Sequence, residues 1–297
     1  MPIASTPAAV GVGERPICEE RDAVSTTTET ATPTETGILL ARDNRNAEVV
    51  TVTLNKPNRK NAMSWAMWQE LRAVLDEIAL DPAIRIVILT GAGGSFCSGA
   101  DLAAPSPRMH PLGQMEVINS VVLALHRLPK VTIARVDGDA VGAGMNLALA
   151  CDLTVATEKS RFSEIFVRRG LSIDCGGSWI LPRLIGLHRA KELCLTGDIV
   201  SAAEARELGL LNRVVPDGAL DEAMDLLVER LLLGAPIAQL VTKRLLTAGG
   251  SSSLDESLDR ESMAQIDNLG SSDSTEARAA FVEKRAPRFT GAWPGRS

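Results

Sequence analysis

The sequence contains few aromatic residues and little positive charge. Its 297 residues include 4 Trp, 5 Phe and no Tyr, and 31 Lys and Arg face 37 Asp and Glu, so the formal net charge is −6. Proteins that bind single-stranded nucleic acids need a basic surface with aromatic side chains on which the bases stack. The composition therefore argues against a nucleic-acid partner.

Long apolar runs, histidine and paired cysteines are also scarce. No stretch approaches the roughly 20 apolar residues of a membrane-spanning helix, and residues 1–18 lack the basic start and apolar block of a secretory signal. The 3 histidines have no HExxH or HxH spacing and the 5 cysteines form no CxxC pair. We therefore expect a cytoplasmic protein with reduced thiols, without a metal site and without membrane contact.

The glycine clusters do not have the spacing of nucleotide-binding loops. After the Gly-Ala-Gly of residues 91–93, a dinucleotide-binding loop needs glycine where Phe96 stands, and after that of residues 142–144 it needs glycine where Leu147 stands. No Gly-Lys-Ser or Gly-Lys-Thr occurs, which excludes a P-loop as well. The glycines must have another use.

Composition divides the chain into three parts. Residues 1–36 are rich in Thr, Ser, Pro and Glu, and they carry too little apolar surface to offset the entropy of ordering. They predict a disordered tail. Residues 37–233 alternate strand-like and helical patterns and predict a catalytic core. Residues 234–297 show helical patterns and no strand pattern. This change after the α/β core predicts an appended region for packing or oligomerisation.

The core pattern is typical of an α/β protein with a parallel sheet. Continuous apolar or β-branched runs predict strands at 49–54, 85–90, 131–136 and 152–156. Between and after them, periodic apolar residues predict helices at 64–80, 115–128, 143–150, 219–233, 236–248, 253–269 and 273–285. Ser64 is the expected cap of the first helix, and Ser201 with Glu204 forms a capping box.

Two strand-to-helix turns, residues 95–102 and 137–144, are built from glycine and other small residues. Such turns leave backbone N–H groups accessible, and the second turn points them along a helix axis, where negative charge is favoured. Two donors that converge on one oxygen would stabilise an enolate by about 3–4 kcal/mol each. From spacing alone, two ordinary tight turns remain the alternative.

The chain resembles the crotonase (enoyl-CoA hydratase/isomerase) superfamily. The residues that carry the resemblance are Phe-Cys-Ser-Gly-Ala-Asp-Leu at 96–102, Val-Asp-Gly-Asp-Ala-Val-Gly-Ala-Gly at 136–144, Leu-Thr-Gly-Asp at 195–198, Ala-Ala-Glu-Ala at 202–205 with Gly-Leu at 209–210, and Phe-Val-Glu-Lys-Arg at 281–285. They span roughly residues 37–291. The loop at 170–179 is most similar to that of epoxyphenylacetyl-CoA and dienoyl-CoA isomerases.

The resemblance implies a spiral of ββα units with a helical C-terminal region, assembled into trimers or pairs of trimers. It implies an acyl-CoA thioester substrate, with the thioester oxygen held by the N–H groups of Ala100 and Ala143. No cofactor is implied, because coenzyme A is part of the substrate. Residues at matching or neighbouring positions are candidates for substrate binding: Lys56, Ala62, Ser98, Gly99, Asp101, Leu102, Gly142, Phe166, Trp179 and, from a neighbouring subunit, Lys284.

The sequence departs from the hydratases of this family at both catalytic glutamates, which are replaced by Asn146 and Phe166. Glu164 lies two residues before the second position. On a helix this offset is about 200° around the axis, so its carboxylate is expected to face away. Asp174 occupies the position of a catalytic aspartate in dienoyl-CoA isomerases, and burial would raise its pKa. A turn residue is the structural alternative for Asp174.

These residues favour an enzyme that moves a double bond or a proton in an enoyl-CoA thioester. Asp174 would remove and return the proton, Ala100 and Ala143 would hold the enolate, and Asn146 would lie beside them. Two alternatives stay open. One is an enoyl-CoA hydratase that adds water to a 2-enoyl-CoA, and the other is a family member that binds CoA esters without catalysis.

Overall fold

The computed structural model describes residues 37–105 and 107–294. The tail predicted for residues 1–36 lies outside these ranges. Among the helices that the structure describes, none combines the length and apolarity needed to cross a membrane.

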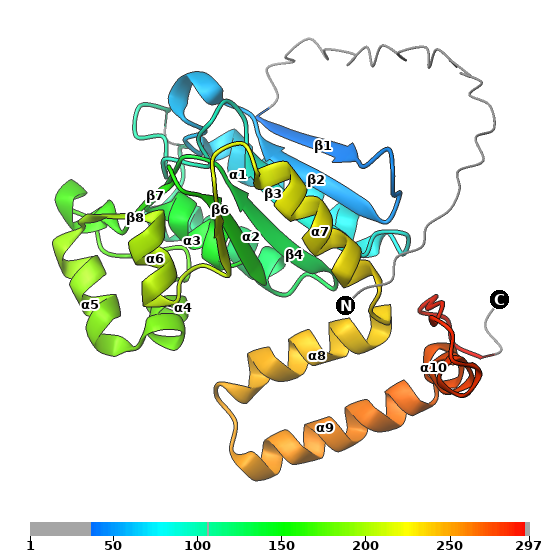
Figure 1. Cartoon of the computed structure of the whole chain (residues 1–297). Coiled ribbons are helices and arrows are strands. Elements are labelled where there is room, and N and C mark those ends of the chain that lie inside the picture. Colours follow the sequence, from blue (N-terminus) through cyan, green and yellow to red (C-terminus); the bar gives the residue numbers. More distant parts are fainter. Residues whose placement is uncertain (1–36, 106, 295–297) are drawn as a thin grey trace, which may run out of the picture. The chain divides into compact units, whose positions relative to one another are not determined.

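A six-stranded sheet lies at the centre of the core (Figure 1). Its order is β1-β2-β3-β4-β6-β9, and all neighbouring strands are parallel except β1 and β2. The strands are β1 (Ile38–Arg42), β2 (Val49–Leu54), β3 (Ile86–Gly91), β4 (Val131–Val136), β6 (Leu153–Thr157) and β9 (Arg213–Val215). The four predicted strands are confirmed to within one residue. β1 escaped prediction because four of its five residues are exposed and leave no core pattern.

Ten helices follow or join these strands in the described residues. They are α1 (Trp65–Leu80), α2 (Pro111–His126), α3 (Ala143–Leu149), α4 (Gly177–Ile185), α5 (Leu187–Thr196), α6 (Ala202–Leu208), α7 (Leu220–Leu232), α8 (Pro236–Gly249), α9 (Leu254–Leu269) and α10 (Ser272–Glu283). Ser64 caps α1 and Ser201 forms a capping box with Glu204, as predicted. α2 begins four residues before the predicted start, because Pro111 opens it and His110 caps it.

Both faces of the sheet are covered, as its apolar strands predict. Alternating side chains such as Val50 and Val87 join the core that contains α1, α2 and α3. The opposite set, including Val49 and Ile86, packs against α7. Since side chains of a strand alternate between the two faces, this division follows directly from the period of two in the sequence.

A second sheet positions the glycine turns. It contains β5 (Asp139–Val141), β7 (Arg161–Ser163) and β8 (Ile199–Ser201), in the order β5-β7-β8. β5 follows β4 after only two residues, so the chain leaves the large sheet and enters the small one at Asp137-Gly138. This transition fixes the start of the second glycine turn.

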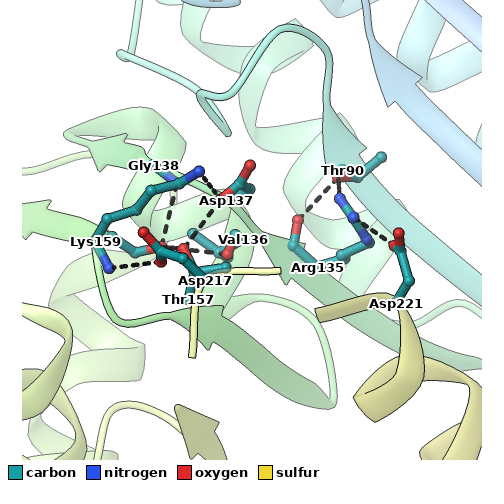
Figure 2. Close-up of polar contacts among 10 residues, drawn as sticks. Thr90, Arg135, Val136, Asp137, Gly138, Thr157, Lys159, Asp217 and Asp221 are labelled. Atoms are coloured by element: carbon teal, nitrogen blue, oxygen red, sulfur yellow. Dashed lines mark hydrogen bonds and ion pairs between the residues drawn. The ribbon is translucent and has the colours of Figure 1, made fainter. Parts of the chain in front are cut away.

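Side chains of the last residue of β6 and of the turn after it hold the transition in place (Figure 2). The Asp137 carboxylate accepts a hydrogen bond of 3.0 Å from the Thr157 hydroxyl and pairs with Lys159 at 2.9 Å. The Gly138 N–H donates to the Ser160 hydroxyl at 3.2 Å. The direction in which β5 departs is thus set by contacts to the next strand of the large sheet.

Gly138→Ala is expected to destabilise the fold by about 3 kcal/mol, the combined effect of left-handed backbone strain and overpacking. Gly138 has a φ of +81°, and an ideal Cβ would lie 2.2 Å from the Gly94 carbonyl oxygen. Gly218→Ala is the matched control, because Gly218 has a φ of +89° but nothing within 4 Å of its Cβ position. Denaturant unfolding measures the loss of unfolding free energy in both variants. The control shows the cost of the left-handed backbone alone, and the difference between the variants gives the cost of the close contact. Equal losses would contradict this account of the turn.

Candidate active site

The two glycine turns are joined directly by backbone hydrogen bonds. The Phe96 and Cys97 N–H groups donate to the Asp139 carbonyl at 3.0 and 2.9 Å, and the Val141 N–H donates to the Cys97 carbonyl at 2.9 Å. Gly99 has a φ of +97°, and a Cβ there would lie 3.7 Å from the Ala143 nitrogen. The structure therefore brings together the residues predicted to act in pairs.

Ala100 and Ala143 each present a backbone N–H without an acceptor among residues 37–105 and 107–294. Met63 forms backbone hydrogen bonds with the residues on both sides of Ala100. Its N–H donates to the Gly99 carbonyl at 2.8 Å, and its carbonyl accepts from the Asp101 N–H at 2.9 Å. Ala143 is the first residue of α3, so its N–H is one of the free donors of a helix start. Both groups are available to a negatively charged oxygen.

Basic side chains surround the first turn. Lys56 pairs with Asp101 at 2.8 Å and Arg59 pairs with it at 3.3 Å, while the Asp101 side chain is only 6% exposed. The hydrogen bond from Lys56 is the largest cause that lowers the pKa of Asp101, to about 2. Ser98 is fixed by its own N–H, which donates to the Lys60 carbonyl at 3.0 Å. The predicted binding residues Lys56, Ser98, Gly99 and Asp101 thus form one cluster.

Asn61 is a scaffold residue of this cluster that the sequence did not reveal. It is fully buried and has a φ of +56°. Its side-chain oxygen accepts from the Lys56 N–H at 2.9 Å, and its amide nitrogen donates to the Ala92 and Ser95 carbonyls at 2.8 and 2.6 Å. An Asn three residues before a helix cap is typical of a turn, so only the contacts of Asn61 identify this role. The next residue, the predicted binding residue Ala62, is buried beside it.

Asn146 and Asp174 lie next to each other in the structure. Asn146 is fully buried on α3, and its Nδ2 donates to the backbone carbonyl of Asp174 at 3.0 Å. The Asp174 residue is partly exposed rather than fully buried, but its Oδ1 is enclosed and has no partner among the described residues. Burial raises the pKa of Asp174, and a hydrogen bond from the Cys175 thiol opposes the rise.

The prediction that Glu164 faces away is wrong. Its side chain is fully buried, and its Oε2 accepts a hydrogen bond of 3.3 Å from the Asn146 amide. The error lies in the assumed helix. Glu164 directly follows β7 and precedes the 3₁₀ helix η2 (Ile165–Arg169). Glu164 itself has φ −88° and ψ 60°, outside the α-helical region, so α-helical spacing does not set the direction of its side chain, and Phe162, Glu164 and Phe166 are all buried.

The remaining predicted residues are more scattered. Phe166 lies beside Gly142, since a Cβ on that glycine would be 3.6 Å from its ring. Trp179, on α4, contacts the His126 ring edge-on and lies under the Arg183 guanidinium. Leu102 is 70% exposed. Lys284 is exposed at the end of α10. Across the described residues, no group of three His, Cys, Asp or Glu is arranged to hold a metal ion.

A family model described as enoyl-CoA hydratase/isomerase matches residues 44–292, which include both turns, Asn146 and Asp174. The chain belongs to the enoyl-CoA hydratase/isomerase family. A protein of Mycobacterium leprae named as a probable enoyl-CoA hydratase is 39% identical to it over 259 residues, covering 83% of this chain and 88% of the relative. The 1,2-epoxyphenylacetyl-CoA isomerase of Escherichia coli is 36% identical over 250 residues, covering 82% of this chain and 95% of the relative.

The fold of the family is confirmed by solved structures. The crystal structure of an enoyl-CoA hydratase from Bacillus anthracis superposes on this structure with a TM-score of 0.81, and the two sequences are 34% identical. The match covers 86% of this chain and 99% of that one. The predicted crotonase-like α/β fold and superfamily membership are therefore correct, and the chain is an enzyme of this family.

Proposed function

We propose that the protein is an acyl-CoA isomerase that moves a double bond or a proton in an enoyl-CoA thioester. One observation carries the proposal: Asp174 is a carboxyl with a raised pKa, partly open to solvent, beside Asn146. The two positions where family hydratases carry glutamates hold Asn146 and Phe166, neither of which transfers protons. The isomerase name of the Escherichia coli relative supports the same reaction class.

Asp174 acts first as a base and then as an acid. Its carboxylate takes a proton from the carbon next to the thioester, or from the vinylogous carbon. The electron pair passes to the thioester oxygen, and the N–H groups of Ala100 and Ala143 hold the resulting enolate. Asp174 then returns the proton to the other carbon, so one carboxyl suffices and no water is consumed. A raised pKa brings the group closer to neutral pH, where it transfers protons most effectively.

The coenzyme A part of the substrate is proposed to bind at the basic cluster of the first turn. Lys56 is held there by Asp101, which stays ionised, and Arg59 lies beside it. Lys284 would reach the nucleotide part from a neighbouring subunit, as the family resemblance implies. Phosphates of coenzyme A favour such pairs of cations over the isolated lysines of an ordinary surface.

A homotrimer or a pair of trimers is proposed as the assembly. α8 has no buried residue, and large apolar side chains of the C-terminal helices are exposed. They are Leu246, Leu254, Leu258, Met263, Ile266, Leu269, Phe281 and Val282. Clusters of exposed apolar side chains mark interaction surfaces, and a second copy of the chain is the partner that the resemblance implies.

Incubation with 2-enoyl-, 3-enoyl- and dienoyl-CoA, followed by mass spectrometry and NMR, tests the reaction. We expect a product of unchanged mass in which the double bond has moved. A product heavier by one water, formed at a comparable rate, would instead identify a hydratase. Binding without turnover of any of these thioesters would identify a CoA-ester-binding member of the family.

A further inference from the structure

Glu164 is a buried carboxyl without a positive partner. Its side chain is fully enclosed, and no Lys, Arg or His within residues 37–105 and 107–294 forms an ion pair with it. Its hydrogen-bond donor in this part of the chain is the Asn146 amide. An ionised carboxyl in such a place has a high desolvation cost, which a neutral carboxyl avoids.

The three polar side chains at this point are short of donors. The two protons of the Asn146 amide are used by the Asp174 carbonyl at 3.0 Å and by Glu164 Oε2 at 3.3 Å. Three enclosed oxygens are left without a donor: Asn146 Oδ1, Glu164 Oε1 and Asp174 Oδ1. Carboxylates only accept hydrogen bonds, whereas a protonated carboxyl also donates one. A proton on one of the two carboxyls supplies one of these missing donors.

The surroundings place that proton on Glu164 rather than on Asp174. Desolvation raises the pKa of Glu164 to about 8, and the negative charge of Asp174 adds to the rise. Asp174 is partly exposed, so its charge is less desolvated than a charge on the fully buried Glu164 would be. The two thiols that face Glu164 are neutral, since burial raises the pKa values of Cys175 and, to about 11, of Cys194.

The neighbouring elements supply no charge that would reverse this order. α3 contributes no titratable side chain, and the Asn146 amide that it carries is neutral. The two arginines that flank Glu164 pair with carboxylates at the surface: Arg161 with Asp139 and Arg168 with Asp198.

We propose that Glu164 is a positioning residue that carries a proton at neutral pH, so that it orients the Asn146 amide and leaves Asp174 as the ionised member of the group Asn146, Glu164 and Asp174. The proposal rests on the proposed function, in which Asp174 is the base. It explains how two carboxyls fit side by side although neither forms an ion pair with a Lys, Arg or His of the described residues. A second negative charge at this point would oppose Asp174 by like-charge repulsion.

Infrared difference spectroscopy of wild type against Glu164→Gln, in the absence of substrate, measures the protonation state directly. At pH 7 the wild type should show a protonated carboxyl band that Glu164→Gln lacks, and this band should disappear as the pH rises through about 8. Absence of the band at pH 7 would overturn the proposal. Since no substrate is present, this result does not depend on which reaction the enzyme performs.

Kinetics then test how Glu164 acts. Glu164→Leu removes the acceptor of the Asn146 amide and should lower kcat about tenfold with KM unchanged. Glu164→Gln restores a neutral acceptor and should recover most of this loss, with the acid limb of the kcat/KM profile at the wild-type pH. A shift of that limb to lower pH in Glu164→Gln would show that an ionised Glu164 had been raising the pKa of Asp174, and would contradict the proposal.

Discussion

Asp174→Asn is expected to lower kcat at least about 100-fold, because general acid–base groups contribute roughly 10²–10⁴ to the rate. The substitution keeps size and polarity but removes the basic oxygen. KM should change little, since the carboxyl acts in proton transfer rather than in uniform binding. Steady-state kinetics of the purified variant measure both constants.

Asp76→Asn is a suitable control for this variant. Asp76 lies on the surface of α1 and pairs with Arg72 one helical turn before it, a contact of small energetic value. It should leave kcat unchanged. The pH profile of the wild type adds a second check. Activity needs ionised Asp174 and is lost as the pH falls through its pKa, which burial raises, so the acid limb should lie above the ordinary aspartate value.

Ala143→Pro is expected to lower kcat about 10²–10³-fold, the effect of removing one oxyanion donor. Ala143 is the first residue of α3, a position where proline fits a helix because the N–H there has no helical acceptor. The preceding residue is Gly142, which carries no Cβ that could clash with the ring. The variant therefore removes the backbone N–H of residue 143 and should leave helix α3 intact.

Leu187→Pro makes the same change at the first residue of α5, which also follows a glycine, Gly186. Leu187→Pro should retain both melting temperature and kcat. If Ala143→Pro has a normal melting temperature and wild-type kcat, the Ala143 N–H does not hold the enolate oxygen. The assignment of the oxyanion site to this pair of turns would then be wrong.

Most of the large sheet and its helices could be predicted from the sequence, because buried strands and amphipathic helices each produce a characteristic pattern of apolar residues. The run at 49–54 and the capping residue Ser64 are examples, and the C-terminal helices agree equally well. The glycine turns were recognisable because few other residues allow such close approach of backbone. Gly99 and Ala143 are brought together as the two motifs predicted.

The direction of Glu164 could not be predicted, since it depends on tertiary pairing of a very short strand. β7 has three residues and pairs with β5, another three-residue strand. Neither segment is long enough to show a period in the sequence. The α-helical spacing applied to Glu164 and Phe166 was therefore wrong, because Glu164 precedes the 3₁₀ helix that contains Phe166. Asn61 was missed for a related reason, because its role rests on contacts to residues more than thirty positions away.

The central claim is that Asp174 alone moves the proton of the substrate. Its most direct test is the exchange of substrate protons with solvent deuterium, followed by NMR for an enoyl-CoA that the wild type isomerises. The wild type and Asp76→Asn should exchange the migrating proton at similar rates, and Asp174→Asn should exchange it at least about 100-fold more slowly. Exchange by Asp174→Asn at the wild-type rate would contradict the claim.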